Sequence, residues 1–299
     1  MIKLQILFTA RGEFTMNLLK GADVVTAINT KIKEELAQFL EPLPHLAIVR
    51  IGERPDDLSY ERGAKKRMET IGLRCSIYSY PDTITNSEFQ KEFTAINSNR
   101  DIDGILLLRP LPNHIDEKAI ESIIDPEKDV DGISPVNMAK IFAGDPSGFA
   151  PCTAEAVIEM LDYAQIPLTG KRVTIVGRSL VVGKPLAMLL IQKNCTITVC
   201  HTKTVDLPTT CQNAEILIAC AGCAKMLNHS YIGSQAIVID VGINLDENQK
   251  LCGDVDLESI SSTASLATPV PGGVGTVTTS VLAKHVMQSY KRRKQELCR

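Results

Sequence analysis

The sequence contains no tryptophan and few other aromatic residues, 4% in all. It also has no excess of positive charge, because 32 basic residues are balanced by 35 acidic ones, for a net charge of −3. Nucleic-acid-binding and membrane-surface proteins usually need a basic face, and proteins that bind single strands use aromatic side chains on which bases stack. These partners are therefore not expected. No apolar run approaches the length needed to cross a bilayer.

The sequence also lacks the cysteine pattern of a secreted disulfide framework, because its nine cysteines are an odd number and are scattered. Reduced thiols in a cytoplasmic protein fit this usage better. Cys220 and Cys223 form the one close pair. A redox or metal function would need a second pair or nearby histidines, so we expect no metal site. Residues 1–15 lack the long apolar core of a signal peptide and are expected to form a disordered extension.

The length of 299 residues and the apolar content of 44% are typical of a globular protein with two domains. Runs rich in Val, Ile and Leu alternate with helical patterns, as buried parallel strands do in α/β units. We expect strands at 45–52, 73–80, 104–108, 172–176, 196–200, 215–219 and 236–241, and helices at 21–39, 56–71, 86–99 and 186–192. Residues 126–151 show little periodicity and are the expected linker. The predicted fold class is α/β, with two domains and parallel sheets.

The first chemical motif is GRSLVVGKP at residues 177–185, between an expected strand and an expected helix. Gly177 at the strand end permits a tight turn, and Gly183 lets the helix N-terminus approach a phosphate. The spacing is GxxxxxG and not GxGxxG, so a plain strand–helix turn remains an alternative interpretation.

The residues after the next strand indicate which dinucleotide is bound. NAD sites usually place an acidic residue there, to hold the ribose hydroxyls. Here the strand is followed by His201, Thr202 and Lys203, and the first acid is Asp206. Together with Arg178, these donors suit a 2′-phosphate. The sequence therefore predicts NADP before NAD.

A second motif, PVPGGVG at residues 269–275, is rigid and poor in side chains. Such a loop exposes backbone N–H groups and lets a ligand approach closely. A contact with cofactor or substrate is favoured over a purely structural turn.

Seven short segments, taken together and in this order, resemble one known family. They are PEKDVDG at 126–132, PVN at 135–137, PCT at 151–153, GRSLVVGKP at 177–185, CHTKT at 200–204, DVGIN at 240–244 and PVPGGVG at 269–275. From about residue 16 to its end, the chain resembles the bacterial methylenetetrahydrofolate dehydrogenase/cyclohydrolase family. The resemblance implies an N-terminal α/β folate domain at 16–150, to which a C-terminal helix at 279–299 returns. It also implies a Rossmann-like NADP domain at 151–278, an active-site cleft between the domains, and a homodimer.

The resemblance also implies a reaction in one-carbon metabolism. NADP would oxidise 5,10-methylenetetrahydrofolate to the methenyl cation, which would then be hydrolysed to 10-formyltetrahydrofolate. Tyr60 would stack on or orient the folate, and Asp131 would hydrogen-bond its pterin ring. Pro271, Gly272 and Gly273 would line the folate side of the cleft. The expected cofactor contacts are Gly177, Arg178, Ser179, Gly183, Thr202 and Ile243.

Two departures from the family pattern concern the hydrolysis step. The family has a lysine four residues after the tyrosine, where this chain has Ala64, and a glutamine that hydrogen-bonds the lysine, where it has Leu108. Either the water-adding step is weak or another base serves it, with Lys66 as the expected substitute. The predicted catalytic residues are therefore Tyr60, Lys66 and Asp131.

Three alternatives stay open at this point. One is a monofunctional dehydrogenase of the same family. Another is an oxidoreductase of the amino-acid dehydrogenase type, which would need a catalytic lysine pair and an acid after the second Rossmann strand. The third is a non-catalytic NADP-binding protein, which would have no need to keep Tyr60, Asp131 and the glycine loop.

Overall fold

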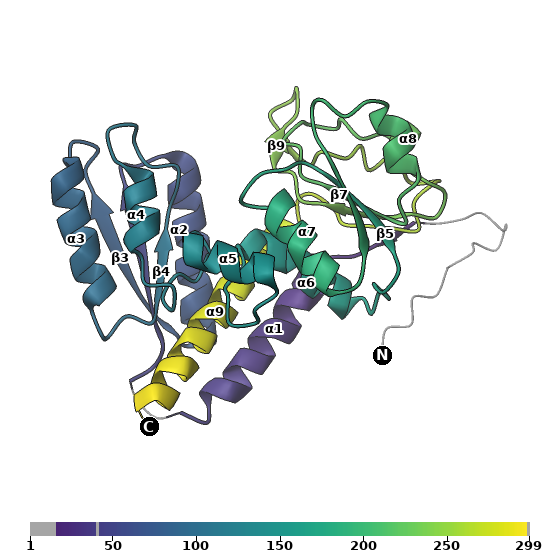
Figure 1. The fold of residues 1–299 in the computed structure, drawn as a ribbon. Helices are drawn as coiled ribbons and strands as arrows, with labels where there is room; N and C mark the ends of the chain where they lie inside the picture. Colours follow the sequence, from purple (N-terminus) through teal and green to yellow (C-terminus); the bar gives the residue numbers. More distant parts are fainter. Residues whose placement is uncertain (1–15, 40–41, 298–299) are drawn as a thin grey trace. The chain divides into compact units, whose positions relative to one another are not determined.

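The computed structural model describes residues 16–39 and 42–297 (Figure 1). The expected extension at residues 1–15 lies outside this part of the chain. The described residues divide into two compact units. One, the three-stranded unit, comprises residues 27–152 and those from 279 onward; the other, the six-stranded unit, comprises residues up to 26 and 153–278. Helices α1 (Gly21–Leu36), α6 (Cys152–Tyr163) and α9 (Val274–Leu297) each contribute residues to both units.

The three-stranded unit is built on a parallel sheet in the order β3-β2-β4. Its strands are β2 (His45–Ile51), β3 (Arg74–Tyr80) and β4 (Gly104–Leu107), and its further helices are α2 (Pro55–Ile71), α3 (Asn86–Ser98), α4 (Glu117–Ile123) and α5 (Pro135–Ala143). Ala47, Val49 and Ile51 of β2 pack in one core with Phe89 and Phe93 of α3. Side chains alternate along a strand, so Ile48 and Arg50 point to the opposite face.

Helix α2 covers the face of the sheet to which Arg50 points, because the Arg50 side chain bonds to Glu61 of that helix. Pro55 occupies its first turn, where a missing N–H is tolerated, and Gly72 ends it with a φ of 98°. Its buried residues recur every three or four positions, at Asp57, Glu61, Ala64, Met68 and Ile71. This spacing gives the helix one buried face.

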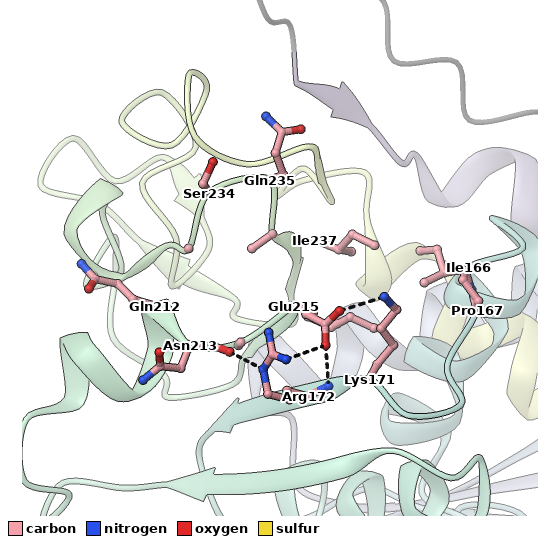
Figure 2. A pocket seen from close by; sticks show the side chains of 14 residues that line it. Ile166, Pro167, Lys171, Arg172, Gln212, Asn213, Glu215, Ser234, Gln235 and Ile237 are labelled. Carbon is pink, nitrogen blue, oxygen red and sulfur yellow. Dashed lines mark hydrogen bonds and ion pairs between the residues drawn. The ribbon is translucent and has the colours of Figure 1, made fainter.

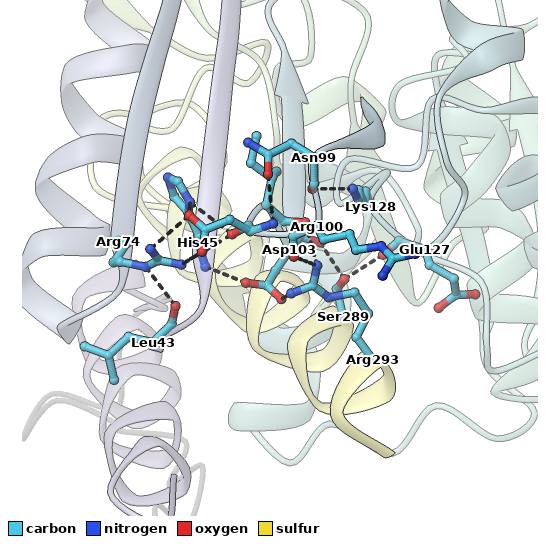
Figure 3. Close-up of polar contacts among 12 residues, drawn as sticks. Leu43, His45, Arg74, Asn99, Arg100, Asp103, Glu127, Lys128, Ser289 and Arg293 are labelled. Atoms are coloured by element: carbon cyan, nitrogen blue, oxygen red, sulfur yellow. Dashed lines mark hydrogen bonds and ion pairs between the residues drawn. The ribbon is translucent and has the colours of Figure 1, made fainter. Parts of the chain in front are cut away.

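A polar network fixes the last helix, α9, to the amino ends of the strands in the three-stranded unit (Figure 3). The carboxyl of Asp103, 1% exposed, accepts hydrogen bonds from the His45 amide at 2.8 Å and from the Arg293 guanidinium. The Ser289 hydroxyl lies 2.5 Å from the Asp103 carbonyl and 2.7 Å from that of Glu127. Because these contacts pair the buried Asp103 carboxyl and Ser289 hydroxyl, they fix the register of the helix on the sheet.

The six-stranded unit has an all-parallel sheet in the order β1-β11-β8-β7-β5-β6. Its strands are β1 (Asn17–Leu18), β5 (Arg172–Val176), β6 (Thr196–Cys200), β7 (Ile216–Ala219), β8 (Ile237–Asp240) and β11 (Leu266–Ala267). It also holds α7 (Gly183–Gln192), α8 (Leu207–Gln212), the 3-10 helix η1 (His229–Tyr231) and an antiparallel pair, β9 (Asn244–Leu245) with β10 (Leu251–Cys252). Successive strands change sides at β5: β6 pairs with it on one side and β7 on the other. Such a switch point is where doubly wound sheets bind ligands.

The predicted α/β class with parallel sheets is confirmed, and the predicted strands match to within one residue at each end. One prediction differs from the structure. The expected linker at 126–151 contains α5, which buries the polar Asn137 and leaves the apolar Val136 and Phe142 exposed. The Asn137 side-chain amide donates to the Pro126 carbonyl and the Asp129 carboxylate. Residues 17–18 pair with β11, and residues 16–26 lie in the six-stranded unit. No described helix is long and apolar enough to cross a membrane.

Candidate functional site

The glycine-rich turn lies at the switch point of the six-stranded unit. Gly177 follows β5 with a φ of 135°, and a Cβ there would be 2.2 Å from the carbonyl oxygen of Cys220, which follows β7. A Cβ on Gly183, the first residue of α7, would be 2.2 Å from the Gly177 carbonyl oxygen. Both positions therefore require glycine because backbones approach closely.

Donor side chains surround this turn. Val176 of β5 pairs with Cys200 of β6, and Arg178 and Thr202 each follow that pair by two residues. Both are exposed, as are Ser179 and Lys203. No side chain caps the N-terminus of α7. This donor set suits a phosphate, with the positive end of the helix dipole behind it.

The first carboxylate after β6 belongs to Asp206, and this carboxylate caps a helix. It caps α8 by accepting a hydrogen bond from the Thr209 amide at 3.5 Å. The acid that an NAD site would place at the end of the second strand is therefore missing from this position. The residues present fit the 2′-phosphate of NADP.

The loop at 269–275 and Ile243 come together in the same unit. Gly272 has a φ of 98°, and a side chain on it would meet no atom within 4 Å. The amide of Gly21 donates to its carbonyl at 2.8 Å, which fixes the loop. Ile243 is 67% exposed, and its Cδ1 lies 3.5 Å from the position of a Cβ on Gly275. Pro271 is exposed. The loop offers backbone groups and an apolar side chain to a ligand.

Two buried carboxylates that sequence reasoning missed support the loops after β7 and β8. Asp254 accepts hydrogen bonds from the amides of Ala221, Gly222 and Cys223, at 2.6, 3.1 and 2.8 Å. Asp240 accepts from three amides between residues 242 and 255. Burial raises the pKa of Asp240 to about 6. Only the DVGIN segment, which contains Asp240, gave a sequence signal for this arrangement.

The same contacts give the Cys220–Cys223 segment a structural role, because three of its amides converge on one carboxylate. Burial raises the pKa of the Cys220 thiol to about 12, so this thiol stays protonated. Among residues 16–39 and 42–297, no group of three or more His, Cys, Asp or Glu side chains is placed to hold a metal ion.

In the three-stranded unit, Tyr60 is half-buried on α2 and Ala64 lies one turn later with no exposed surface. Leu108 follows β4, is 6% exposed, and donates its amide to the Val49 carbonyl at 2.9 Å. Lys66 is exposed. On an ideal helix it is rotated about 200° from Ala64. The structure therefore does not bring Lys66 to the buried face that carries Ala64.

Asp131 and its neighbour Asp129 have different surroundings. Asp129 is fully buried and accepts from the amides of Ile133 and Ser134 at 2.9 and 2.8 Å, so it is the residue that forms the turn. Asp131 is half-buried and accepts from the Cys152 amide at 3.0 Å. Burial raises the pKa of the Asp131 carboxyl, and the hydrogen bond from Cys152 opposes that rise. The PCT segment thus positions Asp131.

A separate pocket of about 490 Å³ lies at the amino ends of β5, β7 and β8, and none of the predicted site residues lines it (Figure 2). Its cations are already paired: Lys171 Nζ is 2.8 Å from one Glu215 oxygen, and Arg172 is 3.4 Å from the other. Arg172 also donates to the Asn213 carbonyl at 3.0 Å. Nothing in this pocket points to a particular ligand.

A parallel sheet with a glycine turn at its switch point and exposed donors around it defines a dinucleotide-binding domain, here joined to a second α/β unit. Family models give the particular class. Residues 19–131 match the catalytic domain of tetrahydrofolate dehydrogenase/cyclohydrolase, and residues 151–294 match its NAD(P)-binding domain. The chain belongs to this family of enzymes, and the resemblance found in the sequence is confirmed.

Relatives and solved structures agree with this assignment. The bifunctional protein FolD of Clostridium kluyveri is 46% identical over 278 residues, which is 92% of this chain and 98% of the relative. FolD of Clostridioides difficile is 47% identical over 280 residues, 92% of this chain and 96% of the relative. The structure of the bifunctional enzyme FolD from Campylobacter jejuni superposes with a TM-score of 0.89 at 36% identity, covering 93% of this chain and 99% of that one. The Trypanosoma brucei methylenetetrahydrofolate dehydrogenase-cyclohydrolase, complexed with NADP cofactor and inhibitor, gives 0.88 at 32% identity, covering 93% and 98%.

Proposed function

We propose that this chain oxidises 5,10-methylenetetrahydrofolate to 5,10-methenyltetrahydrofolate with NADP and hydrolyses the product to 10-formyltetrahydrofolate. The observation that carries the proposal is the match of both family domains, catalytic and NAD(P)-binding, within one chain. The relatives named bifunctional cover almost the whole chain, which supports both steps.

The preference for NADP rests on the residues around the glycine turn. NADP supplies the hydride acceptor when it is bound, and the protein binds and orients it. Arg178 and Thr202 would hold the 2′-phosphate, with Lys203 as a further donor, and Gly177, Gly183 and Ser179 would form the turn that receives the pyrophosphate. Ile243 would supply an apolar contact to the cofactor. Charge-assisted bonds from an arginine to a phosphate are among the strong ones in proteins.

Five residues are proposed to hold the folate. Asp131 accepts hydrogen bonds from the donor-rich pterin ring, and the Cys152 amide keeps its carboxyl oriented. Tyr60 orients the folate from α2. Pro271, Gly272 and Gly273 contribute a surface with little side chain. Their common task is to hold the reacting carbon where the hydride can leave, which is an effect of position and not of acid or base.

The hydrolysis step depends on proton transfer. This chain lacks the lysine and the glutamine that the family resemblance implies for that step. Ala64 and Leu108 are apolar and buried where the resemblance places a lysine and its glutamine partner. Lys66, the substitute that the sequence suggested, is exposed. The geometry supports slow hydrolysis more than catalysis by Lys66.

We further propose that the protein is a cytoplasmic homodimer that associates through its six-stranded unit. Strand β6 lies at the edge of that sheet, and its Val199 is exposed together with Ile191 of α7. The described cysteines are free thiols, the state expected in a reducing compartment. Light scattering coupled to gel filtration tests the dimer, and cell fractionation tests the location.

The reaction is tested by mixing purified protein, methylenetetrahydrofolate and NADP, and following the absorbance of reduced cofactor. We expect reduction with NADP and much slower reduction with NAD. Equal rates with both cofactors would contradict the cofactor assignment, and no folate-dependent reduction with either would contradict the proposed function.

A further inference from the structure

A buried ion pair joins β2 to α2 in the three-stranded unit. The Nε atom of Arg50 lies 2.7 Å from the Oε2 atom of Glu61, and the two side chains are 12% and 10% exposed. A second nitrogen of the guanidinium donates to the carbonyl of Gly52, where β2 ends. Arg50 therefore ties the helix to the carboxyl end of the strand.

The pair lies beside the two positions where this chain departs from the family pattern. Val49 pairs with Leu107 in the parallel register of β2 and β4, so Arg50 and Leu108 are the next positions along. Paired residues of parallel strands point to the same face. On α2, Glu61 precedes Ala64 by three residues on the same buried face. A polar contact between strand and helix is therefore present next to these two positions. Arg50 lies on the strand beside Leu108, and Glu61 lies one helical turn before Ala64.

We propose that Arg50 and Glu61 are positioning residues for the folate, which set the placement of Tyr60 by fixing the first turns of α2 on the sheet. The inference rests on the proposed function. Tyr60 directly precedes Glu61, so a displacement of the Glu61 backbone carries Tyr60 with it. The planar guanidinium suits this task because its donors have a fixed geometry.

A positioning role and a purely stabilising role for the pair predict different results. A buried ion pair can often be replaced by apolar residues of similar size without loss of stability, whereas removal of one partner leaves an uncompensated charge. Positioning and stability can therefore be separated by comparing single variants with the double variant.

The experiment compares Arg50→Leu, Glu61→Leu and the double variant with the unmodified protein. Both singles should unfold at lower temperature. The double variant should recover most of the lost thermal stability, yet keep a kcat/KM for methylenetetrahydrofolate lowered about 10- to 100-fold, as expected for a misplaced contact. The KM for NADP should stay within about twofold in every folded variant, because Arg50 and Glu61 lie in the other unit.

Arg74→Ala is the matched control. It removes another arginine–carboxylate contact of the same unit, to Asp101, at the opposite end of the strands. It should reduce stability without a selective effect on folate. A double variant whose folate kcat/KM recovers with its stability would overturn the positioning role. If the unmodified protein forms no reduced cofactor with methylenetetrahydrofolate, the proposed function itself fails, and the positioning role falls with it before any variant is compared.

Discussion

Replacing Ala64→Lys together with Leu108→Gln should raise the rate of methenyltetrahydrofolate hydrolysis by about 10²- to 10⁴-fold, the usual contribution of a positioned acid or base. Each change alone should do much less. A lysine at position 64 alone would lack the glutamine that orients its ammonium group, and a glutamine at position 108 alone would have no lysine to orient.

The structure also sets the stability cost of this change. Ala64 has no exposed surface and Leu108 is 6% exposed. Overpacking at position 64 costs about 1–3 kcal/mol, and loss of the buried leucine about 1.5–3 kcal/mol. The sum of about 2.5–6 kcal/mol is a large part of a typical total stability of roughly 5–15 kcal/mol. Far-ultraviolet circular dichroism and thermal unfolding must therefore show that the double variant is folded before its rate is compared.

The assay follows the loss of methenyltetrahydrofolate absorbance and subtracts the rate in buffer. Lys66→Ala, and Lys65→Ala at the exposed lysine that precedes it, serve in the unmodified background as controls for a substitute base. Fast hydrolysis by the unmodified protein that survives both lysine substitutions would refute the reasoning, because a lysine would then be unnecessary. A folded double variant with an unchanged rate would refute the assignment of positions 64 and 108.

Three further predictions test the other residues. Arg178→Ala should raise the KM for NADP about 10- to 100-fold, because one charge-assisted contact of about 1.5–3 kcal/mol is lost. The KM for NAD should stay nearly constant. An equal rise for both cofactors would contradict a 2′-phosphate contact. Asp131→Ala should abolish most folate turnover and leave NADP binding and the melting temperature nearly unchanged; a large fall in melting temperature would show instead that Asp131 forms a structural turn, as Asp129 does. Burial raises the pKa of Asp240 to about 6 from 3.8, so the native state holds this proton more tightly than the unfolded state does. The contribution of Asp240 to stability is therefore present at low pH and is lost as the pH rises through about 6. Urea unfolding at pH 5 and 7.5 should therefore show a smaller pH dependence in Asp240→Asn than in the unmodified protein, and identical dependences would contradict this linkage.

The sequence by itself determined the elements whose signal is local. The buried parallel strands appear as continuous apolar runs, because helices cover both faces of such sheets, and their predicted ends hold to within one residue. Gly177 could also be predicted, because a tight turn after a strand demands a backbone conformation that glycine alone adopts easily. The donors after β6 and the missing acid were likewise visible, since they follow the strand directly.

Only the tertiary structure decided which polar groups meet across the chain. It separates Asp129, saturated by its own turn, from Asp131, which depends on the amide of Cys152, 21 residues away. It brings Asp254 to the amides of residues 221–223 and pairs Arg50 with Glu61. It also places the two-residue strand β1 and the short helix α5, which buries the polar Asn137. A carboxylate or guanidinium carries no periodic signal of its partner, because hydrogen bonding depends on distance in space and not on spacing along the chain. The apolar pattern therefore determines the layers, and the fold determines the contacts within the site.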